Sequence, residues 1–306
     1  MNEYCQNHKD LDYCKYVERR VPAMFCKLAC QCNWRQFMHT DREPRRDACR
    51  KPVEDDGSLV TVIVPVCRAD EQYLDRTAKS VLDNAMGRVE FVPVVDWYDE
   101  GIRTLLNRLV DSADSKYVVK LDCHTALTKD WDVRMKLSCG ENVIVKPVLD
   151  CLDTERWEGK GYDMGPVIIT SEMATKYQSP WRSIENRRTE EETMGLIGCC
   201  WMIRKDYYKE LGGCDESLGK WGLLGAEWSL KTWLTGGKCL LRTDVVCSHL
   251  FRKQTPFEVD LEVKRKGQKK LLRLWVAGES GEQTRPIQWL LDKFVPVIPK
   301  RALVTA

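Results

Sequence analysis

The feature that most constrains this chain is an alternation of apolar and amphipathic segments in its first half. Residues 59–66, 90–95 and 117–121 are rich in β-branched and apolar side chains, as strands of a parallel sheet covered on both faces are. Between them, residues 74–85 and 102–110 repeat apolar residues at helical spacing. This order predicts a right-handed βαβαβ arrangement, and therefore an α/β, Rossmann-like fold with a mainly parallel sheet flanked by helices.

The second half of the chain continues the sheet with less regular spacing. We expect further strands at residues 143–148, 198–203 and 239–246, and further helices at residues 206–211, 226–234 and 287–294. The last helix has one apolar face, which should pack on the domain. Residues 151–195 are rich in charge and tryptophan, and we expect a long connection there.

Length and composition indicate one large α/β domain with a small appendage, because the chain has 306 residues and is 43 % hydrophobic. A Lys-Pro pair and an acidic run separate a Cys-rich segment at residues 1–52 from the α/β domain, expected at residues 53–255. A basic helical extension is expected at residues 256–306. Residues 1–52 and 252–306 together carry a formal charge of +10 within a total of +2. Basic terminal segments of this kind are typical of solvated surface or of proteins that bind nucleic acid.

The cysteines are numerous, but their distribution argues against a disulfide scaffold. Their number, 15, is odd, and nine are spread singly after Cys49, several of them within expected strands. This pattern indicates a reducing, cytoplasmic compartment. No apolar run approaches the roughly 20 residues of a membrane span, and the first 12 residues are polar and acidic, so we expect neither a span nor a secretory signal.

Six cysteines crowd into the first 49 residues. Four of them could supply thiolates to a structural Zn²⁺, namely Cys26, Cys30, Cys32 and Cys49. A metal would stabilise a 52-residue segment that has few large apolar side chains. The alternative is a helical hairpin with buried free thiols.

Two of the four histidines follow expected strands. Asp122-Cys123-His124 comes directly after a buried strand, so Asp122 and His124 can point into one cleft at the carboxyl edge of the sheet, where such folds bind ligands. His249 also follows a strand. One carboxylate and two imidazoles, with two phosphate oxygens, would complete the coordination of a Mn²⁺ that bridges a diphosphate. The alternative is a chance tripeptide and a histidine of the core.

Several stretches in order carry a resemblance to a known family. They are VTVIVPVCRADEQYLDRTAKSVL, EFVPVVD, EGIR, YVVKLDCH, VIVKPVLDCLD, GCCWMIRKDYYKELGGCDESLGKWG, EWSLKTWLTGG and CSHLFRK. Over roughly residues 59–253 the chain resembles the polypeptide N-acetylgalactosaminyltransferases and, more broadly, family 2 glycosyltransferases. The resemblance implies a GT-A fold and sugar transfer from a nucleotide sugar with a divalent cation.

The resemblance also implies roles for individual residues. It makes Asp122, His124 and His249 the ligands of Mn²⁺ or Mg²⁺. The residues it places at the nucleoside are Pro65, Cys67, Arg68 and Asp96. It brings Arg103 to the diphosphate, which a guanidinium suits, and Trp221 near the donor sugar and the acceptor. The structural alternatives are a turn cap for Asp96, a solvent-facing helix position for Arg103 and core packing for Trp221.

The chain departs from the family after Trp221-Gly222, where the transferases usually carry an acidic residue. Here Leu-Leu-Gly-Ala intervenes and the first acid is Glu227. We interpret Glu227 as a general base or a ligand of a sugar hydroxyl, with a structural salt bridge as the alternative. A Glu227 base would invert the anomeric carbon, and transfer without a base would retain it, which the resemblance slightly favours. We expect the chain to lack the membrane anchor and the lectin module of those transferases, so their protein acceptor is not carried over.

Together these observations predict a metal-dependent glycosyltransferase that uses a nucleotide sugar, specifically a uridine diphosphate sugar. Because basic ends flank an acidic middle, we expect the acceptor to be a nucleic acid, with the hydroxyl on a hydroxymethylated base in DNA. The rival acceptors are a glycan and a protein. The rival from another class is a non-catalytic nucleic-acid or sugar-binding protein built on a decayed transferase fold.

Overall fold

A computed structural model of the chain describes residues 38–40, 53–162, 164–170, 173–177, 189–252 and 254–294. The four cysteines of the expected zinc site lie outside these residues, so that site stays a prediction. In the described part, no helix combines the length and the apolar character that crossing a membrane requires.

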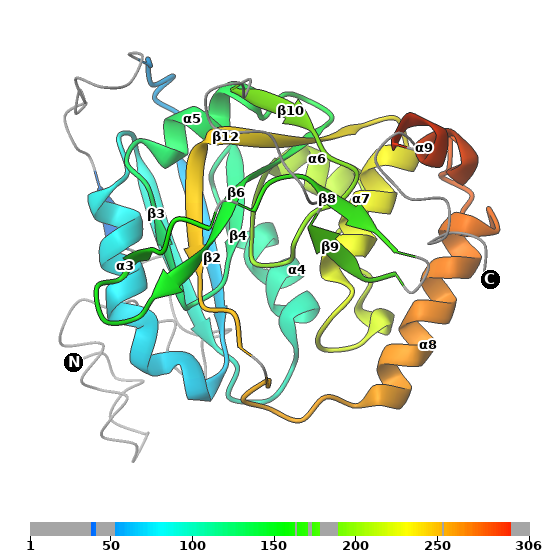
Figure 1. The fold of residues 1–306 in the computed structure, drawn as a ribbon, viewed down its shortest axis with the longest axis horizontal. Helices are drawn as coiled ribbons and strands as arrows, with labels where there is room; N and C mark the ends of the chain where they lie inside the picture. The colour runs from blue at the N-terminus through cyan, green and yellow to red at the C-terminus, as the bar shows by residue number, and fades with distance from the viewer. Residues whose placement is uncertain are drawn as a thin grey trace.

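The first half of the sheet confirms the predicted βαβαβ arrangement. β2 (Val60–Val66) lies between β3 (Val89–Val95) and β4 (Tyr117–Leu121), and both neighbours run parallel to it. α3 (Leu74–Asp83) and α4 (Ile102–Ser112) make the crossovers. The three strands are buried almost throughout, as their β-branched composition predicts. Their carboxyl ends therefore meet at one edge of the sheet (Figure 1).

The second half of the sheet contains one reversed strand. β11 (Cys200–Arg204) runs antiparallel to both of its neighbours, β4 and β6 (Val143–Asp153), and β12 (Lys238–His249) then pairs with β6 in parallel. The main sheet has the strand order β1-β3-β2-β4-β11-β6-β12-β10. Its edges are two short antiparallel strands, β1 (Met38–Thr40) and β10 (Glu190–Glu192). The sheet is thus mainly parallel, as expected.

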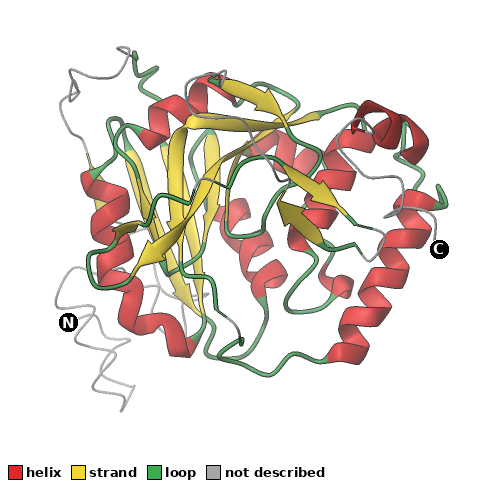
Figure 2. Cartoon of the chain, in the orientation of Figure 1, coloured by secondary structure: helices red, strands yellow, loops and turns green. Residues whose placement is uncertain are grey.

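Helices cover both faces of the sheet and make three layers (Figure 2). One face packs against α3 and α5 (Trp131–Ser138). The other packs against α4 and against four later helices: α6 (Lys205–Glu210), α7 (Leu224–Leu234), α8 (Leu261–Leu271) and α9 (Ile287–Phe294). A π-helical turn at Leu272–Val276 continues α8. The expected apolar face of the last helix is confirmed, since Leu290 and Phe294 lie in this core.

The structure adds elements that the sequence pattern does not show. β6 runs five residues beyond the predicted strand, and the expected long connection contains β7 (Glu158–Gly159), β8 (Val167–Ile169) and β9 (Thr175–Tyr177). β5 (Thr125–Leu127) and α5 are new as well. α5 has no amphipathic pattern because its charged side chains are buried too: Arg134 pairs with Asp244, and Asp132 accepts the backbone N–H groups of residues 86 and 87.

Candidate metal centre

β4, β5 and β12 bring the three expected metal ligands together. Asp122 and His124 lie in the short connection between β4 and β5, and His249 is the last residue of β12. β5 pairs with the end of β12 so that His249 lies opposite Thr125, and the Leu250 N–H donates to the His124 carbonyl at 3.1 Å. Two histidines 125 residues apart in sequence therefore meet at the carboxyl edge of the sheet.

The three expected ligand groups lie close enough together to bind one cation. The Nε2 atom of His249 lies 3.1 Å from Nε2 of His124 and 3.2 Å from Oδ2 of Asp122. One ligand atom from each residue lies within 4.8 Å of the other two. These distances are short enough for the three groups to bind one divalent cation together. A carboxylate oxygen with two imidazole nitrogens is a mixed O/N donor set that suits Mn²⁺.

Asp70 supports His124 from the side away from the cluster. It lies in the 3-10 turn Arg68–Tyr73, and its Oδ2 is 3.1 Å from Nδ1 of His124. The Arg252 guanidinium donates to both carboxylate oxygens of Asp70. Burial raises the pKa of Asp70, but the contacts with His124 and Arg252 outweigh it and hold the pKa at about 2. An ionised carboxylate at the second nitrogen of a ligand histidine fixes the orientation of the ring.

The protonation states of the cluster also suit a cation. Burial raises the pKa of Asp122, but the ammonium of buried Lys120 and the His249 ring outweigh it and hold the pKa below its usual range. Burial lowers the pKa of His249, although the adjacent Asp122 acts in the opposite direction. An ionised carboxylate and a neutral imidazole are the forms that bind a divalent cation.

The nucleoside residues expected from the sequence gather at the same edge. Pro65 lies near the end of β2, paired with Val94 of β3, and Cys67 and Arg68 follow β2 directly. The Arg68 guanidinium donates to the carbonyl of Trp97 at 2.8 Å and lies 4.7 Å from the centre of its ring. Burial raises the pKa of Cys67 to about 12, so this residue is a protonated thiol at neutral pH.

Asp96 follows β3 and closes the turn that leads to α4. Its two carboxylate oxygens accept the backbone N–H groups of Glu100 at 2.7 Å and Gly101 at 2.8 Å. The structure therefore shows the turn cap that was the structural alternative for this residue. Asp96 is half-buried at the edge of the sheet, so the cap is compatible with a contact to a bound nucleoside.

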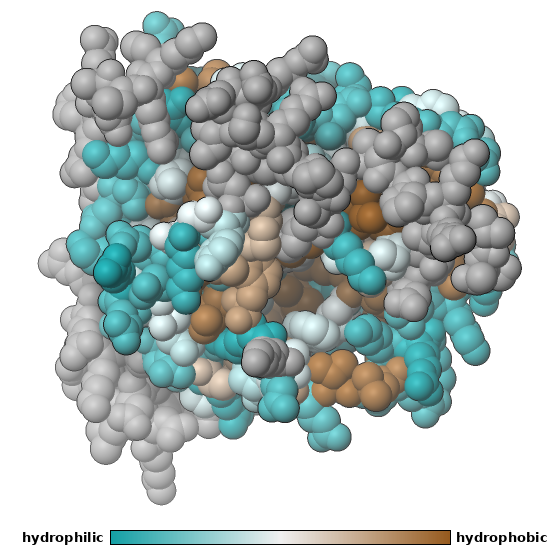
Figure 3. Space-filling model, in the orientation of Figure 1, coloured by the Kyte–Doolittle hydropathy of each residue, from teal (hydrophilic) through white to brown (hydrophobic). Residues whose placement is uncertain are grey.

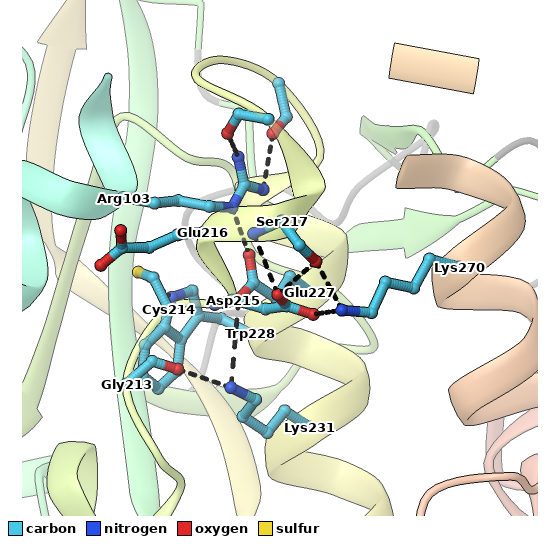
Figure 4. Close-up of polar contacts among 12 residues, drawn as sticks. Arg103, Gly213, Cys214, Asp215, Glu216, Ser217, Glu227, Trp228, Lys231 and Lys270 are labelled. Atoms are coloured by element: carbon cyan, nitrogen blue, oxygen red, sulfur yellow. Dashed lines mark hydrogen bonds and ion pairs between the residues drawn. The ribbon is translucent and has the colours of Figure 1, made fainter. Parts of the chain in front are cut away.

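Arg103 and Glu227 lie in the core instead of at the ligand-binding edge. Each side chain is 1 % exposed, and Nε of Arg103 donates to Oε2 of Glu227 at 2.8 Å (Figure 4). This position differs from the expected diphosphate contact of Arg103 and from the expected base or sugar ligand role of Glu227. The physical reason is that each group satisfies the other's charge, so neither side chain reaches the surface.

Trp221 is at the surface, with 42 % of the residue exposed. Its ring makes an edge contact with the ring of Phe257, at a centroid distance of 5.6 Å. Lys220, the preceding residue, packs against Gly101 in the turn closed by Asp96. Core packing, the alternative for Trp221, is therefore not what the structure shows, and the indole is free to contact a ligand near this edge.

Comparisons with known proteins agree with the fold. No protein-family model matches the chain. Polypeptide N-acetylgalactosaminyltransferase 3 of Taeniopygia guttata is 24 % identical over 233 residues, which cover 72 % of this chain and 38 % of that protein. Polypeptide N-acetylgalactosaminyltransferase 13 of Homo sapiens is 25 % identical over 189 residues, which cover 58 % and 34 %. The chain thus spans less than two fifths of the length of these relatives.

A solved structure supports the same conclusion about the fold. It is described as GalNAc-T7 with UDP, GalNAc and Mn²⁺, and it matches with a TM-score of 0.63 at 14 % identity, over 81 % of this chain and 59 % of that one. The fold is of the GT-A type. The resemblance seen in the sequence is confirmed, and the relatives of the chain are glycosyltransferases.

Sequence reasoning missed two residues that contact the candidate metal ligands. Asp70 lies in a 3-10 turn, and no spacing rule links it to a histidine 54 residues later. Lys120 is visible as a charge inside an otherwise apolar strand, two residues before Asp122. That interruption is a signal that could have pointed to it, since a buried lysine needs a partner.

Proposed function

We propose that this chain is a metal-dependent glycosyltransferase that moves a sugar from a uridine diphosphate sugar to an acceptor hydroxyl. The observation that carries the proposal is the convergence of Asp122, His124 and His249 at the carboxyl edge of a GT-A sheet. These residues would hold Mn²⁺ or Mg²⁺. When bound, such an ion offsets the negative charge that develops on a diphosphate leaving group.

The protein groups around the cluster prepare it for that role. Asp70 and Lys120 hold His124 and the Asp122 carboxylate in place, so little rearrangement accompanies binding. The ends of β2 and β3 offer Arg68 and Asp96 to the nucleoside side of the same edge. The match to a structure of GalNAc-T7 with UDP and Mn²⁺ supports a uridine nucleotide as the donor.

We further propose that transfer retains the configuration of the sugar. Both carboxylate oxygens of Glu227 accept hydrogen bonds inside the core, from the Asp215 N–H and from Arg103. A general base must reach the acceptor hydroxyl, and Glu227 does not reach the surface. The reaction would then need no base from Glu227, and the leaving phosphate would take the proton.

For the acceptor we propose a hydroxymethylated base in DNA, and α8 is the observation that favours it. This helix carries five basic residues and one acidic residue: Lys264, Arg265, Lys266, Lys269, Lys270 and Glu262. Arg265, Lys266 and Lys269 are exposed, as a surface that binds backbone phosphates requires. α8 packs directly on the loop that carries Trp221, since Gly219 touches Val263. An exposed indole is a surface on which an extruded base can stack.

A protein acceptor is the second candidate, because the relatives are named polypeptide N-acetylgalactosaminyltransferases. The two candidates differ in what they predict for α8. A DNA acceptor requires binding that weakens steeply with salt, whereas a peptide acceptor has no need of this basic surface.

Nucleotide release and product analysis test these proposals. A panel of UDP-sugars with Mn²⁺ would be offered to the protein with hydroxymethylated duplex DNA, with a Ser/Thr-rich peptide, and with neither. We expect release that requires Mn²⁺, is stimulated by the DNA and is lost in His124→Ala. Stimulation by the peptide alone would show that the acceptor is a protein and not DNA. Failure of all donors would leave a non-catalytic binding protein.

DNA binding itself has a matched control. Replacing Arg265 and Lys269 together by Ala should lower the slope of log affinity against log salt by about 2. Replacing Lys209 and Lys238 together by Ala removes the same charge from exposed positions outside α8 and should leave the slope unchanged. Equal effects of the two pairs would contradict docking on α8.

We also propose that residues 1–52 bind Zn²⁺ through Cys26, Cys30, Cys32 and Cys49, and that the protein works in the reducing cytoplasm. The nine described cysteines are all free, which supports the second point. Elemental analysis of the purified protein, with melting in the presence of a chelator, tests the first. Absence of zinc together with unchanged melting would refute it.

A further inference from the structure

Arg103 and Glu227 join the first turns of α4 and α7 deep inside the protein. The guanidinium uses three nitrogens: Nε donates to Oε2 of Glu227, Nη1 to the Gly219 carbonyl at 2.7 Å, and Nη2 to the Gly222 carbonyl at 2.8 Å. The last two contacts hold both ends of the four-residue turn that has Trp221 near its tip. Figure 4 shows Arg103 reaching this turn from one side while Glu227 lies below it.

The turn at residues 219–222 and the residue after it contain left-handed backbone conformations. Gly219 and Gly222 have φ values of +95° and +82°, and Leu223 has a φ of +59°. Glycine adopts such values readily, whereas a left-handed conformation at a residue such as leucine is unfavourable by roughly 1–2 kcal/mol. Contacts that hold this segment therefore have to offset the cost at Leu223. Besides Arg103, the Ile102 N–H donates to the Lys220 carbonyl at 3.0 Å. Both supports come from the start of α4.

Glu227 extends the same network towards α8. Its Oε1 accepts the Asp215 N–H at 2.6 Å, and the Asp215 carboxylate forms an ion pair with Lys270 of α8 at 2.7 Å (Figure 4). On the opposite side Nζ of Lys231 lies 4.0 Å from Oε1. The buried pair thus connects the Trp221 turn, α7 and the basic helix.

A contribution to stability alone does not explain the buried pair of Arg103 and Glu227. Two charged groups at 1 % exposure lose their hydration, and apolar side chains of similar volume are often as stabilising or more so. What an apolar pair cannot do is bind two carbonyl groups at fixed positions. The planar guanidinium has that geometry, and the ammonium of a lysine does not.

Trp221 lies near the region in which a ligand would bind. On the face that carries α8, the space-filling view shows a hollow with apolar residues between the end of β12 and α8 (Figure 3). Phe251, two residues after His249, is 41 % exposed and packs on the His249 ring at 4.5 Å. Trp221 contacts Phe257, which lies on the same segment between β12 and α8.

We propose that Arg103 and Glu227 are positioning residues that fix Trp221 for contact with the substrate of the transferase. The inference rests on the proposed function, and it deepens it by assigning a task to two residues that do not touch the substrate. The pair acts through the turn at residues 219–222, and Trp221 makes the contact.

The first test measures the turn directly and needs no activity. Hydrogen exchange of the segment 216–223 would be followed in the wild type and in Arg103→Lys. The matched control is Arg134→Lys, a buried arginine paired with Asp130 and Asp244 on the other face of the sheet. We expect exchange in this segment at least tenfold faster in Arg103→Lys and unchanged in Arg134→Lys. Unchanged exchange in Arg103→Lys would overturn the proposal. If that variant does not fold, Glu227→Gln takes its place.

The second test asks whether the pair acts through Trp221. In the wild type, Arg103→Lys should lower kcat/KM by roughly 10- to 100-fold through misplacement of a contact residue. In a Trp221→Ala background the same change should alter kcat/KM by less than about twofold, because the contact is already lost. An equal loss in both backgrounds would refute a role through Trp221. If no donor is transferred at all, the proposed function fails, and the exchange experiment still decides whether the pair holds the turn.

Discussion

Replacing the buried residue Lys146 should raise the stability of the protein, whereas most substitutions of buried residues lower it. Lys146 lies in β6, is 0 % exposed, and its Nζ donates to the Gly165 carbonyl at 3.0 Å. Among the described residues no carboxylate lies within ion-pair distance of this ammonium. Burial therefore lowers the pKa of Lys146 from 10.5 to about 8. At about 1.4 kcal/mol for each pKa unit, the buried charge destabilises the folded state by roughly 3 kcal/mol.

Replacing Lys146 by Met should therefore stabilise the protein at pH 7. Met has a similar length and fills the same space with apolar atoms. The lost hydrogen bond to Gly165 is worth about 1 kcal/mol, so the expected net gain is about 2 kcal/mol.

The pH dependence gives a second check on the same variant. Below pH 8 the lysine is charged in both the folded and the unfolded chain, so the folded state bears the full cost. Between about pH 8 and 10.5 the folded chain releases the proton and the unfolded chain keeps it. The stability of the wild type therefore rises relative to that of Lys146→Met, and the advantage of the variant shrinks over this range.

Urea unfolding at pH 7 and pH 10 measures both effects. Lys136→Met is the control, because Lys136 is also buried but is paired with Asp55 and Asp56. Those partners raise the pKa of Lys136 in spite of its burial, so the same substitution should destabilise the protein there. A Lys146→Met protein that is less stable than the wild type at pH 7, or a gain that does not change with pH, would refute the reasoning.

Two further predictions concern buried carboxylates. Glu227→Gln should lower the free energy of unfolding by roughly 3 kcal/mol because it leaves Arg103 buried without its counter-charge. Glu100→Gln should cost less than about 1 kcal/mol, since its arginine pair at 2.7 Å is about one-third exposed; equal losses in urea unfolding would contradict this. Asp70→Asn should weaken Mn²⁺ binding by roughly 10- to 100-fold, because the His124 ring loses its supporting carboxylate. Unchanged Mn²⁺ affinity by electron paramagnetic resonance would exclude that role.

The parts of the fold that could be predicted are those with a local pattern. Runs of β-branched residues predicted the parallel strands, because both faces of those strands are covered by helices. Apolar residues at helical spacing predicted the helices between them. Strand ends then placed Asp122, His124 and His249 at one edge, since parallel strands end together. No local pattern marks α5, whose charged residues are buried on all sides.

The parts of the site that could not be predicted depend on distant partners. In the sequence, Arg103 belongs to an expected helix near an expected phosphate site. Its burial depends on the contact with Glu227, which lies 124 residues later in the chain. Glu227 was expected near a sugar because it is the first acid after Trp221-Gly222. Gly219 and Gly222 indicate a turn, but no sequence pattern indicates the left-handed Leu223 or the contact of this turn with Arg103.

The most direct test of the account is the binding of Mn²⁺ and UDP to the same edge of the sheet. Titration of Mn²⁺ followed by electron paramagnetic resonance, with and without UDP, would compare the wild type with Asp122→Asn and His249→Ala. We predict one Mn²⁺ site in the wild type that tightens when UDP is present, and a loss of at least tenfold in affinity in each variant. Equal Mn²⁺ binding in all three proteins, or binding indifferent to UDP, would contradict a nucleotide-sugar site built on Asp122, His124 and His249.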